Sequence, residues 1–189
     1  MKDLAHAPFA DVAERVGALY NEEQDTLLLP MLGQEYVIRH DGILLRGQKA
    51  PEAHASVLLE YLFSRGTTFA VSPWRSIGEL AGTGFPDFRK KTELPITQYV
   101  AEIIARAKTL LPLFDARMSP SLAGSDMAII VHALPKVYLH VEMSQENQDF
   151  PAEVWVLFSN NASDFLNAAA LQGLAEVFKD RLLSLLRIY

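Results

Sequence analysis

Residues 26–45, TLLLPMLGQEYVIRHDGILL, decide the expected fold. Three short apolar runs follow one another here, separated by Gly33-Gln34-Glu35 and by Asp41-Gly42. Asp-Gly between apolar segments is a strong hairpin signal, because both residues tolerate the positive φ angles of tight hairpin turns. Pro30 cannot donate a ladder hydrogen bond, so it indicates an edge position or a bulge in the first strand. The stretch therefore predicts a three-stranded antiparallel meander.

A second group of extended segments lies in the C-terminal half. The runs 127–131, 137–141 and 154–158 are short and apolar, which favours strands. Apolar residues spaced three and four apart predict helices over 8–20, 51–64, 95–114 and 168–188. Because the strands arrive in adjacent runs rather than alternating singly with helices, we expect an α+β fold.

The expected architecture is one α+β domain over residues 1–189. Two antiparallel three-stranded meanders pack against the amphipathic helices, either as separate sheets or merged into one. Residues 32–38 and 134–140 share an apolar pattern, and each meander precedes a helix. The sequence therefore also allows an ancient duplication.

Composition excludes several function classes. The 189 residues carry a net charge of −6 and contain no cysteine, which rules out disulfide scaffolds, thiolate zinc sites, cysteine-ligated clusters and cysteine nucleophiles. A pI near 5.3 argues against a nucleic-acid partner. No signal peptide is evident, and no apolar run approaches the roughly 20 residues of a membrane span. We expect a cytoplasmic protein without a membrane partner, in an oligomeric state that the sequence leaves open.

The segment 67–92 is the first candidate site. Glycines and prolines interleave there with aromatic residues, and a loop of this length inside a domain often carries function. Its aromatic side chains and their charged neighbours could bind a ligand or a protein partner; they are Trp74, Arg75, Glu79, Phe85 and Phe88. The alternative is that the rings tuck into the core and close the loop.

His132 and His140 form the second candidate site. If their strands fold back around Lys136, the two imidazoles could lie opposite each other and share a metal, with Glu142 or Glu153 as the nearest third ligand. A cation could also be gathered by the acidic run Glu142, Glu146, Asp149 and Glu153. The same residues could act in acid–base catalysis. The alternative is that the histidines merely alternate across the sheet, and that the acidic residues belong to a solvated turn.

Several segments resemble a bacterial domain family of unknown function that is found largely in anaerobes. In the first half the resemblance rests on 58–62 (LLEYL), 66–67 (GT), 74–80 (WRSIGEL), Phe85 and 88–89 (FR). In the second half it rests on 149–154 (DFPAEV), 157–158 (LF), 162–163 (AS) and Leu166. The chain departs from the family at Asn147, Gln148 and Ser159, where acidic residues are usual. The resemblance implies an α+β domain, and it implies no activity or cofactor.

The expected function is a non-catalytic binding or accessory module that takes a protein partner or a small ligand. The sequence contains no phosphate loop, GxGxxG, HExxH or GxSxG motif, and no pattern specifies a cofactor. The alternative is a small metal-assisted or acid–base enzyme that uses His132, His140, Asp149 or Glu153.

Overall fold

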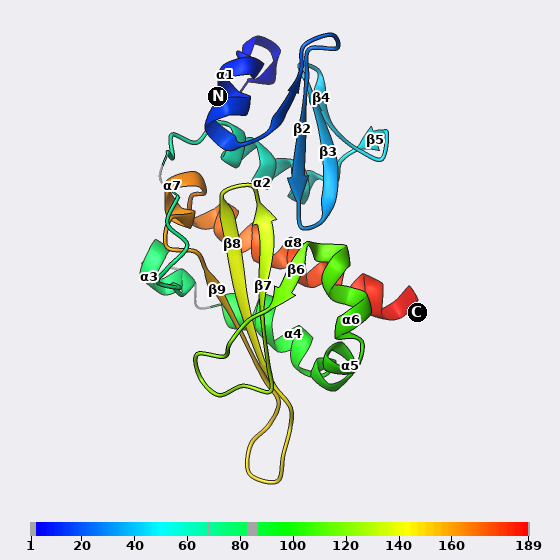
Figure 1. The fold of residues 1–189 in the computed structure, drawn as a ribbon, viewed down its shortest axis with the longest axis vertical. Coiled ribbons are helices and arrows are strands. Elements are labelled where there is room, and N and C mark those ends of the chain that lie inside the picture. The colour runs from blue at the N-terminus through cyan, green and yellow to red at the C-terminus, as the bar shows by residue number, and fades with distance from the viewer. Residues whose placement is uncertain (1–2, 68, 83–86, 189) are drawn as a thin grey trace.

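Two antiparallel sheets, one from each half of the chain, carry the fold (Figure 1). The computed structural model describes residues 3–67, 69–82 and 87–188. In both sheets the strands neighbour one another in chain order. The first sheet holds β1 (Leu19–Asn21), β2 (Thr26–Met31), β3 (Gln34–Arg39), β4 (Gly42–Leu45) and β5 (Gln48–Lys49). The second sheet holds β6 (Ala116–Met118), β7 (Met127–Leu134), β8 (Val137–Ser144) and β9 (Glu153–Phe158). The α+β class and the antiparallel meanders are confirmed.

Helices lie before, between and after the two sheets. They are α1 (Phe9–Val16), α2 (Glu52–Leu62), α3 (Ile77–Ala81), α4 (Leu94–Thr97), α5 (Val100–Ala105), α6 (Ala107–Leu110), α7 (Ala162–Phe165) and α8 (Ala168–Ile188). Short 3₁₀ turns cover Leu4–His6 and Leu111–Phe114, and a π-helical turn covers Arg89–Glu93. Within the described residues, no helix combines the length and apolar character needed to cross a membrane.

The structure differs from the predicted elements in three respects. The helix expected over 8–20 ends at Val16, because Gly17 adopts a left-handed conformation (φ 75°) and β1 begins at Leu19. The helix expected over 95–114 is broken into short pieces, since Tyr99 and Arg106 leave helical geometry (φ −111° and −101°). Each sheet has more strands than the expected three, because β1, β5 and β6 are too short to show a period.

Both sheets turn an apolar face toward one continuous buried cluster. In the first sheet, Leu29 on β2 pairs with Tyr36 on β3, and both are fully buried. In the second sheet, Leu139 on β8 pairs with Phe158 on β9, and these are also fully buried. Helix α8 crosses the middle of the molecule, where the sheets meet, and buries Phe178 among its apolar residues (Figure 1).

The two sheets meet at the tips of the β2–β3 and β7–β8 hairpins. The backbone N–H of Leu32 donates to the carbonyl of Ala133 over 2.9 Å. The hydroxyl of Tyr61 donates to Val16 O over 2.7 Å and accepts from the backbone N–H of Lys136 over 3.1 Å. The similar segments 32–38 and 134–140 therefore hold corresponding hairpin turns that contact each other. Duplication itself stays a prediction.

Gly33 at this junction gives a stability test with an internal control. A Cβ at Gly33 (φ 73°) would lie 2.2 Å from the carbonyl oxygen of Leu113, whereas a Cβ at Gly47 (φ 77°) would meet nothing within 4 Å. Gly47→Ala incurs only the cost of placing a Cβ in left-handed backbone geometry, about 1 to 2 kcal/mol. Gly33→Ala adds a clash with the backbone, so we expect it to lower the free energy of unfolding by at least about 2 kcal/mol more. Urea denaturation measures both, and equal losses would contradict the close approach.

Candidate functional site

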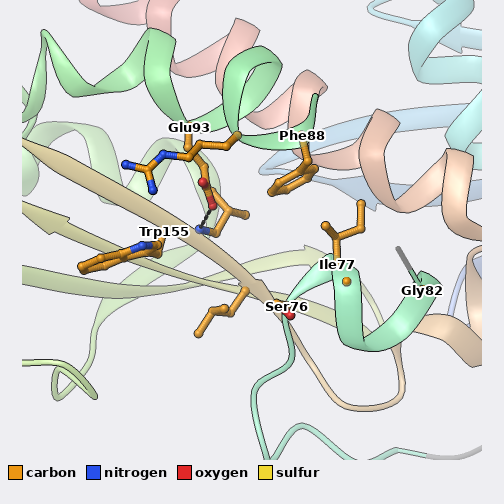
Figure 2. A pocket seen from close by; sticks show the side chains of 10 residues that line it. Ser76, Ile77, Gly82, Phe88, Glu93 and Trp155 are labelled. Atoms are coloured by element: carbon orange, nitrogen blue, oxygen red, sulfur yellow. Dashed lines mark hydrogen bonds between the residues drawn. The ribbon is translucent and has the colours of Figure 1, made fainter. Parts of the chain in front are cut away.

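A cavity of about 460 Å³ opens between α3, the π-helical turn and the edge of β9 (Figure 2). Phe88 and Ile77 face one another across it, and Glu93 is turned toward β9 (Figure 2). The wall is mostly apolar. The described residues that line it are Ser76, Ile77, Gly78, Gly82, Phe88, Arg89, Glu93, Trp155, Val156 and Leu157.

Glu93 places a buried carboxyl group in the wall of this cavity. The residue is 7% exposed, and its Oε1 accepts the backbone N–H of Val156 over 3.0 Å. No hydrogen bond joins its Oε2 to the rest of the described chain. Glu93 is the last residue of the π-helical turn, and turns of this kind are frequent at functional sites. The carboxyl group therefore has one oxygen held by the strand and one available to a ligand.

The outer edge of β9 explains why the side chain of Glu93 points toward this strand. Beyond β8, this strand makes a single bridge to the described residues, in which Arg75 N donates to Phe158 O over 2.9 Å and Phe158 N donates to Arg75 O over 2.8 Å. Two residues earlier, the N–H of Val156 faces outward and would lack a partner. The side chain of Glu93 supplies the acceptor that another strand would otherwise provide.

Burial raises the pKa of Glu93 above its ordinary value of 4.5. The hydrogen bond from Val156 and the positive charge of Arg89 act in the opposite direction, and the charge of Glu153 adds to the rise. Arg89 and Glu153 form an ion pair of 3.2 Å with each other. A ligand that stabilises the ionised form of the Glu93 carboxyl group therefore offsets part of the cost of ionising it in a buried position.

In the described part of 67–92, two aromatic rings pack against residues of the second sheet, whereas Phe69 is exposed. Trp74 stacks on His140 with ring centroids 5.0 Å apart, and Phe88 is buried 6.1 Å from the ring of Phe158. Arg75 donates to Asn160 Oδ1 over 3.1 Å.

Glu79 helps to cap the N-terminus of α3. It pairs with Arg75 over 3.0 Å and forms a capping box with Ser76. Of the five candidates in 67–92, Phe88 lines the cavity. Trp74, Arg75 and Glu79 support its surroundings, and Phe85 lies outside the described residues.

The four candidate metal or acid–base residues lie apart. His132 pairs with Tyr138 across the β7–β8 ladder, whereas His140 pairs with Ile130. Asp149 is exposed in the β8–β9 loop, and Glu153 begins β9 beside Arg89. Within 3–67, 69–82 and 87–188, no three histidine or acidic residues are grouped so that they could hold a metal.

His132 is engaged at both ring nitrogens. Nδ1 lies 2.8 Å from Asp115 Oδ2, and Nε2 lies 3.3 Å from the carbonyl of Pro135. Both ring nitrogens therefore already have an oxygen neighbour within hydrogen-bond distance. His132 also stacks on Tyr138 with ring centroids 4.7 Å apart.

His140 and Glu142 are buried together on the outer face of the second sheet. Glu142 accepts the backbone N–H of Leu122 over 2.7 Å and the hydroxyls of Ser121 and Ser125, each over 2.9 Å. Burial opposes ionisation of Glu142, but these donors outweigh it and hold its pKa below 4.5. Burial lowers the pKa of His140, whose Nδ1 lies 3.7 Å from Glu142. One carboxylate thus fastens the β6–β7 loop onto the sheet.

Sequence reasoning missed Glu93, although a signal was present. Glu93 lies three residues before Ile96 and seven before Val100, in phase with the apolar positions of this segment, and all three are buried. A carboxyl group at an apolar position of a helical period is costly unless it has a partner. That position alone marks Glu93 as a residue with a specific role.

The family described as "Domain of unknown function (DUF3786)" matches residues 8–181, so the chain belongs to it. No curated protein and no solved structure matches the chain. Family membership agrees with the expectation of a domain family of unknown function and adds no activity.

Glu142 predicts an acid-sensitive contribution to stability. Every partner of its carboxylate is a donor, so Glu142→Gln places an amide N–H₂ against N–H or O–H groups, and we expect a loss of about 2 kcal/mol at pH 7. Because the folded pKa is depressed, the wild-type advantage is present above pH 4.5 and is lost as pH falls through the folded pKa.

Chemical denaturation between pH 3 and pH 7 measures this difference. Glu146→Gln, at an exposed position of the next loop, is the matched control and should leave stability within about 0.5 kcal/mol. A pH-independent gap between wild type and Glu142→Gln would contradict the role of the ionised carboxylate.

Proposed function

We propose that this domain is a non-catalytic binding module whose cavity at the edge of β9 takes a small, mainly apolar molecule that carries an amine. The observation that carries the proposal is the buried carboxyl group of Glu93, bonded to Val156 through one oxygen in an otherwise apolar wall. Ligand pockets commonly combine an apolar lining with a few placed polar groups.

An amine suits this carboxyl group better than a neutral donor does. An opposite charge close to a buried carboxyl group favours its ionised form, which burial alone disfavours here. The resulting N–H to carboxylate contact is a charge-assisted hydrogen bond, roughly twice as strong as a neutral one. The apolar part of the ligand would contact Phe88 and Ile77, which face each other in Figure 2.

Binding is favoured over catalysis because the cavity offers little acid–base chemistry. Among its described lining residues, Glu93 and Arg89 are the ionisable ones, and Arg89 already pairs with Glu153. An enzyme that uses His132, His140, Asp149 or Glu153 has less support, since these residues do not converge on one cavity.

Benzylamine and benzyl alcohol test the proposal as a matched pair of probes. The indole N–H of Trp155, which lines the cavity, is observed by NMR, and the chain's other tryptophan, Trp74, serves as an internal reference. Benzylamine should shift the Trp155 signal saturably and leave that of Trp74 unchanged. Its affinity should fall as pH drops through the raised pKa of Glu93, because protonation removes the ion pair.

Glu93→Gln keeps an acceptor for Val156 and removes the charge. We expect it to weaken benzylamine binding by about tenfold and benzyl alcohol binding by less than about threefold. Glu146→Gln removes an exposed carboxylate that does not line the cavity, and it should leave benzylamine binding nearly unchanged. Equal weakening of both probes by Glu93→Gln, or an unresponsive Trp155, would refute the proposal.

A further inference from the structure

A second concave region lies where the β2–β3 turn, the β4–β5 turn and α8 meet. Two cavities of about 540 and 330 Å³ adjoin here, and both are lined by Gln34, Leu45, Arg46 and Arg181. No described residue lines both this region and the Glu93 cavity. The region is therefore a separate site whose shared walls carry two guanidinium groups.

Arg181 is partly buried without a counter-ion. Its Nε donates to Leu32 O over 3.1 Å and its Nη2 donates to Leu113 O over 2.8 Å. The guanidinium carbon lies 5.1 Å from the centre of the Phe114 ring. All of these partners are neutral, and no carboxylate of the described chain lies within 4 Å of the guanidinium. Partly buried charges are normally paired, so Arg181 lacks the anion that its environment calls for.

Arg46 occupies a backbone position that disfavours arginine. It is the first residue of a two-residue turn between the paired Leu45 and Gln48, with φ 52° at Arg46 and 77° at Gly47. Two positive φ angles define a type I′ turn, in which Asn-Gly is strongly preferred. Backbone strain of this kind clusters at functional sites, and the side chain of Arg46 is exposed to solvent. The guanidinium of Arg46 makes no hydrogen bond or ion pair with a described residue.

Arg46 and Arg181 are close enough for their positive charges to affect the same neighbouring group and each other. Burial raises the pKa of Tyr36 to about 12, and both Arg181 and Arg46 oppose that rise. Burial lowers the pKa of Arg181, and the like charge of Arg46 lowers it further. An anion between the guanidiniums would relieve this repulsion.

Two acidic residues also line these cavities, and neither forms an ion pair with Arg46 or Arg181. Asp180 lines one cavity, and its carboxylate is 2.8 Å from the ammonium group of Lys179. Glu35 lines the other cavity and is exposed. His54, whose Nδ1 lies 2.8 Å from the Tyr36 hydroxyl, adds a further polar group to the wall.

We propose that Arg46 and Arg181 bind the phosphoryl group of a small anionic molecule, whose body rests on Leu45 and Leu113. Guanidinium groups match the geometry of phosphate and carboxylate oxygens. Two of them without counter-ions favour a dianion over a monoanion by charge alone, so phosphate is the expected anion and a carboxylate the competing outcome.

Isothermal titration calorimetry with sodium phosphate, at pH 7.5 and constant ionic strength, tests the site. Sodium acetate is the competing probe. Wild-type protein should bind phosphate saturably and acetate at least about tenfold more weakly. Arg46→Asn places the preferred residue in the turn, so the fold is retained while one guanidinium is lost. This variant should weaken phosphate binding by about tenfold or more.

Arg65→Asn is the matched control, because Arg65 is exposed and lines neither cavity. It should bind phosphate as the wild type does. Glu93→Gln should also bind phosphate normally, which separates this site from the proposed amine site. Absent phosphate binding, or equal losses in Arg46→Asn and Arg65→Asn, would overturn the proposal. Acetate binding as tight as phosphate would overturn the phosphoryl assignment.

Discussion

The fold depends on satisfying the backbone groups that two hairpin tips bury against each other. Where the β2–β3 and β7–β8 turns meet, direct pairing covers only part of their polar groups, as in the bond from Leu32 to Ala133. Side chains from helices supply other partners, namely the hydroxyl of Tyr61 and the guanidinium of Arg181. Because an unpaired buried backbone group is costly, these two residues fix the relative position of the sheets. The site at β9 and the arginine pair are both built around that frame.

Sequence periodicity predicted the elements that follow a single rule over many residues. Helix α8 matches its expected bounds of 168–188, and α2 lies inside the expected 51–64, because their apolar stripes face one core. In the segment 95–114, the apolar residues Ile96, Val100 and Ile103 are buried on one side, as the period predicted. The helix itself is broken into short pieces. Burial of a stripe requires only that each short helix faces inward, so the period alone could not reveal the breaks at Tyr99 and Arg106.

The sequence indicated a segment that borders the candidate site, but it did not indicate the residue that gives the site its chemistry. The aromatic segment 67–92 does reach the cavity, through Ile77 and Phe88, but most of its notable side chains brace the loop. The decisive group, Glu93, belongs to the π-helical turn that follows, and only its phase with Ile96 marked it. The proximity of Glu93 to Val156 joins residues 63 apart in the chain. No local pattern encodes such a contact, because it arises from how the edge of β9 packs.

Helix α8 follows every strand of both sheets in the chain. The strands of both sheets therefore precede, in order of synthesis, the helix that covers their meeting point. Until Arg181 emerges, the carbonyl of Leu32 lacks its distant partner, and the apolar faces around Leu29 and Leu139 lack a cover. The docking of α8 therefore completes both the polar and the apolar closure of the junction.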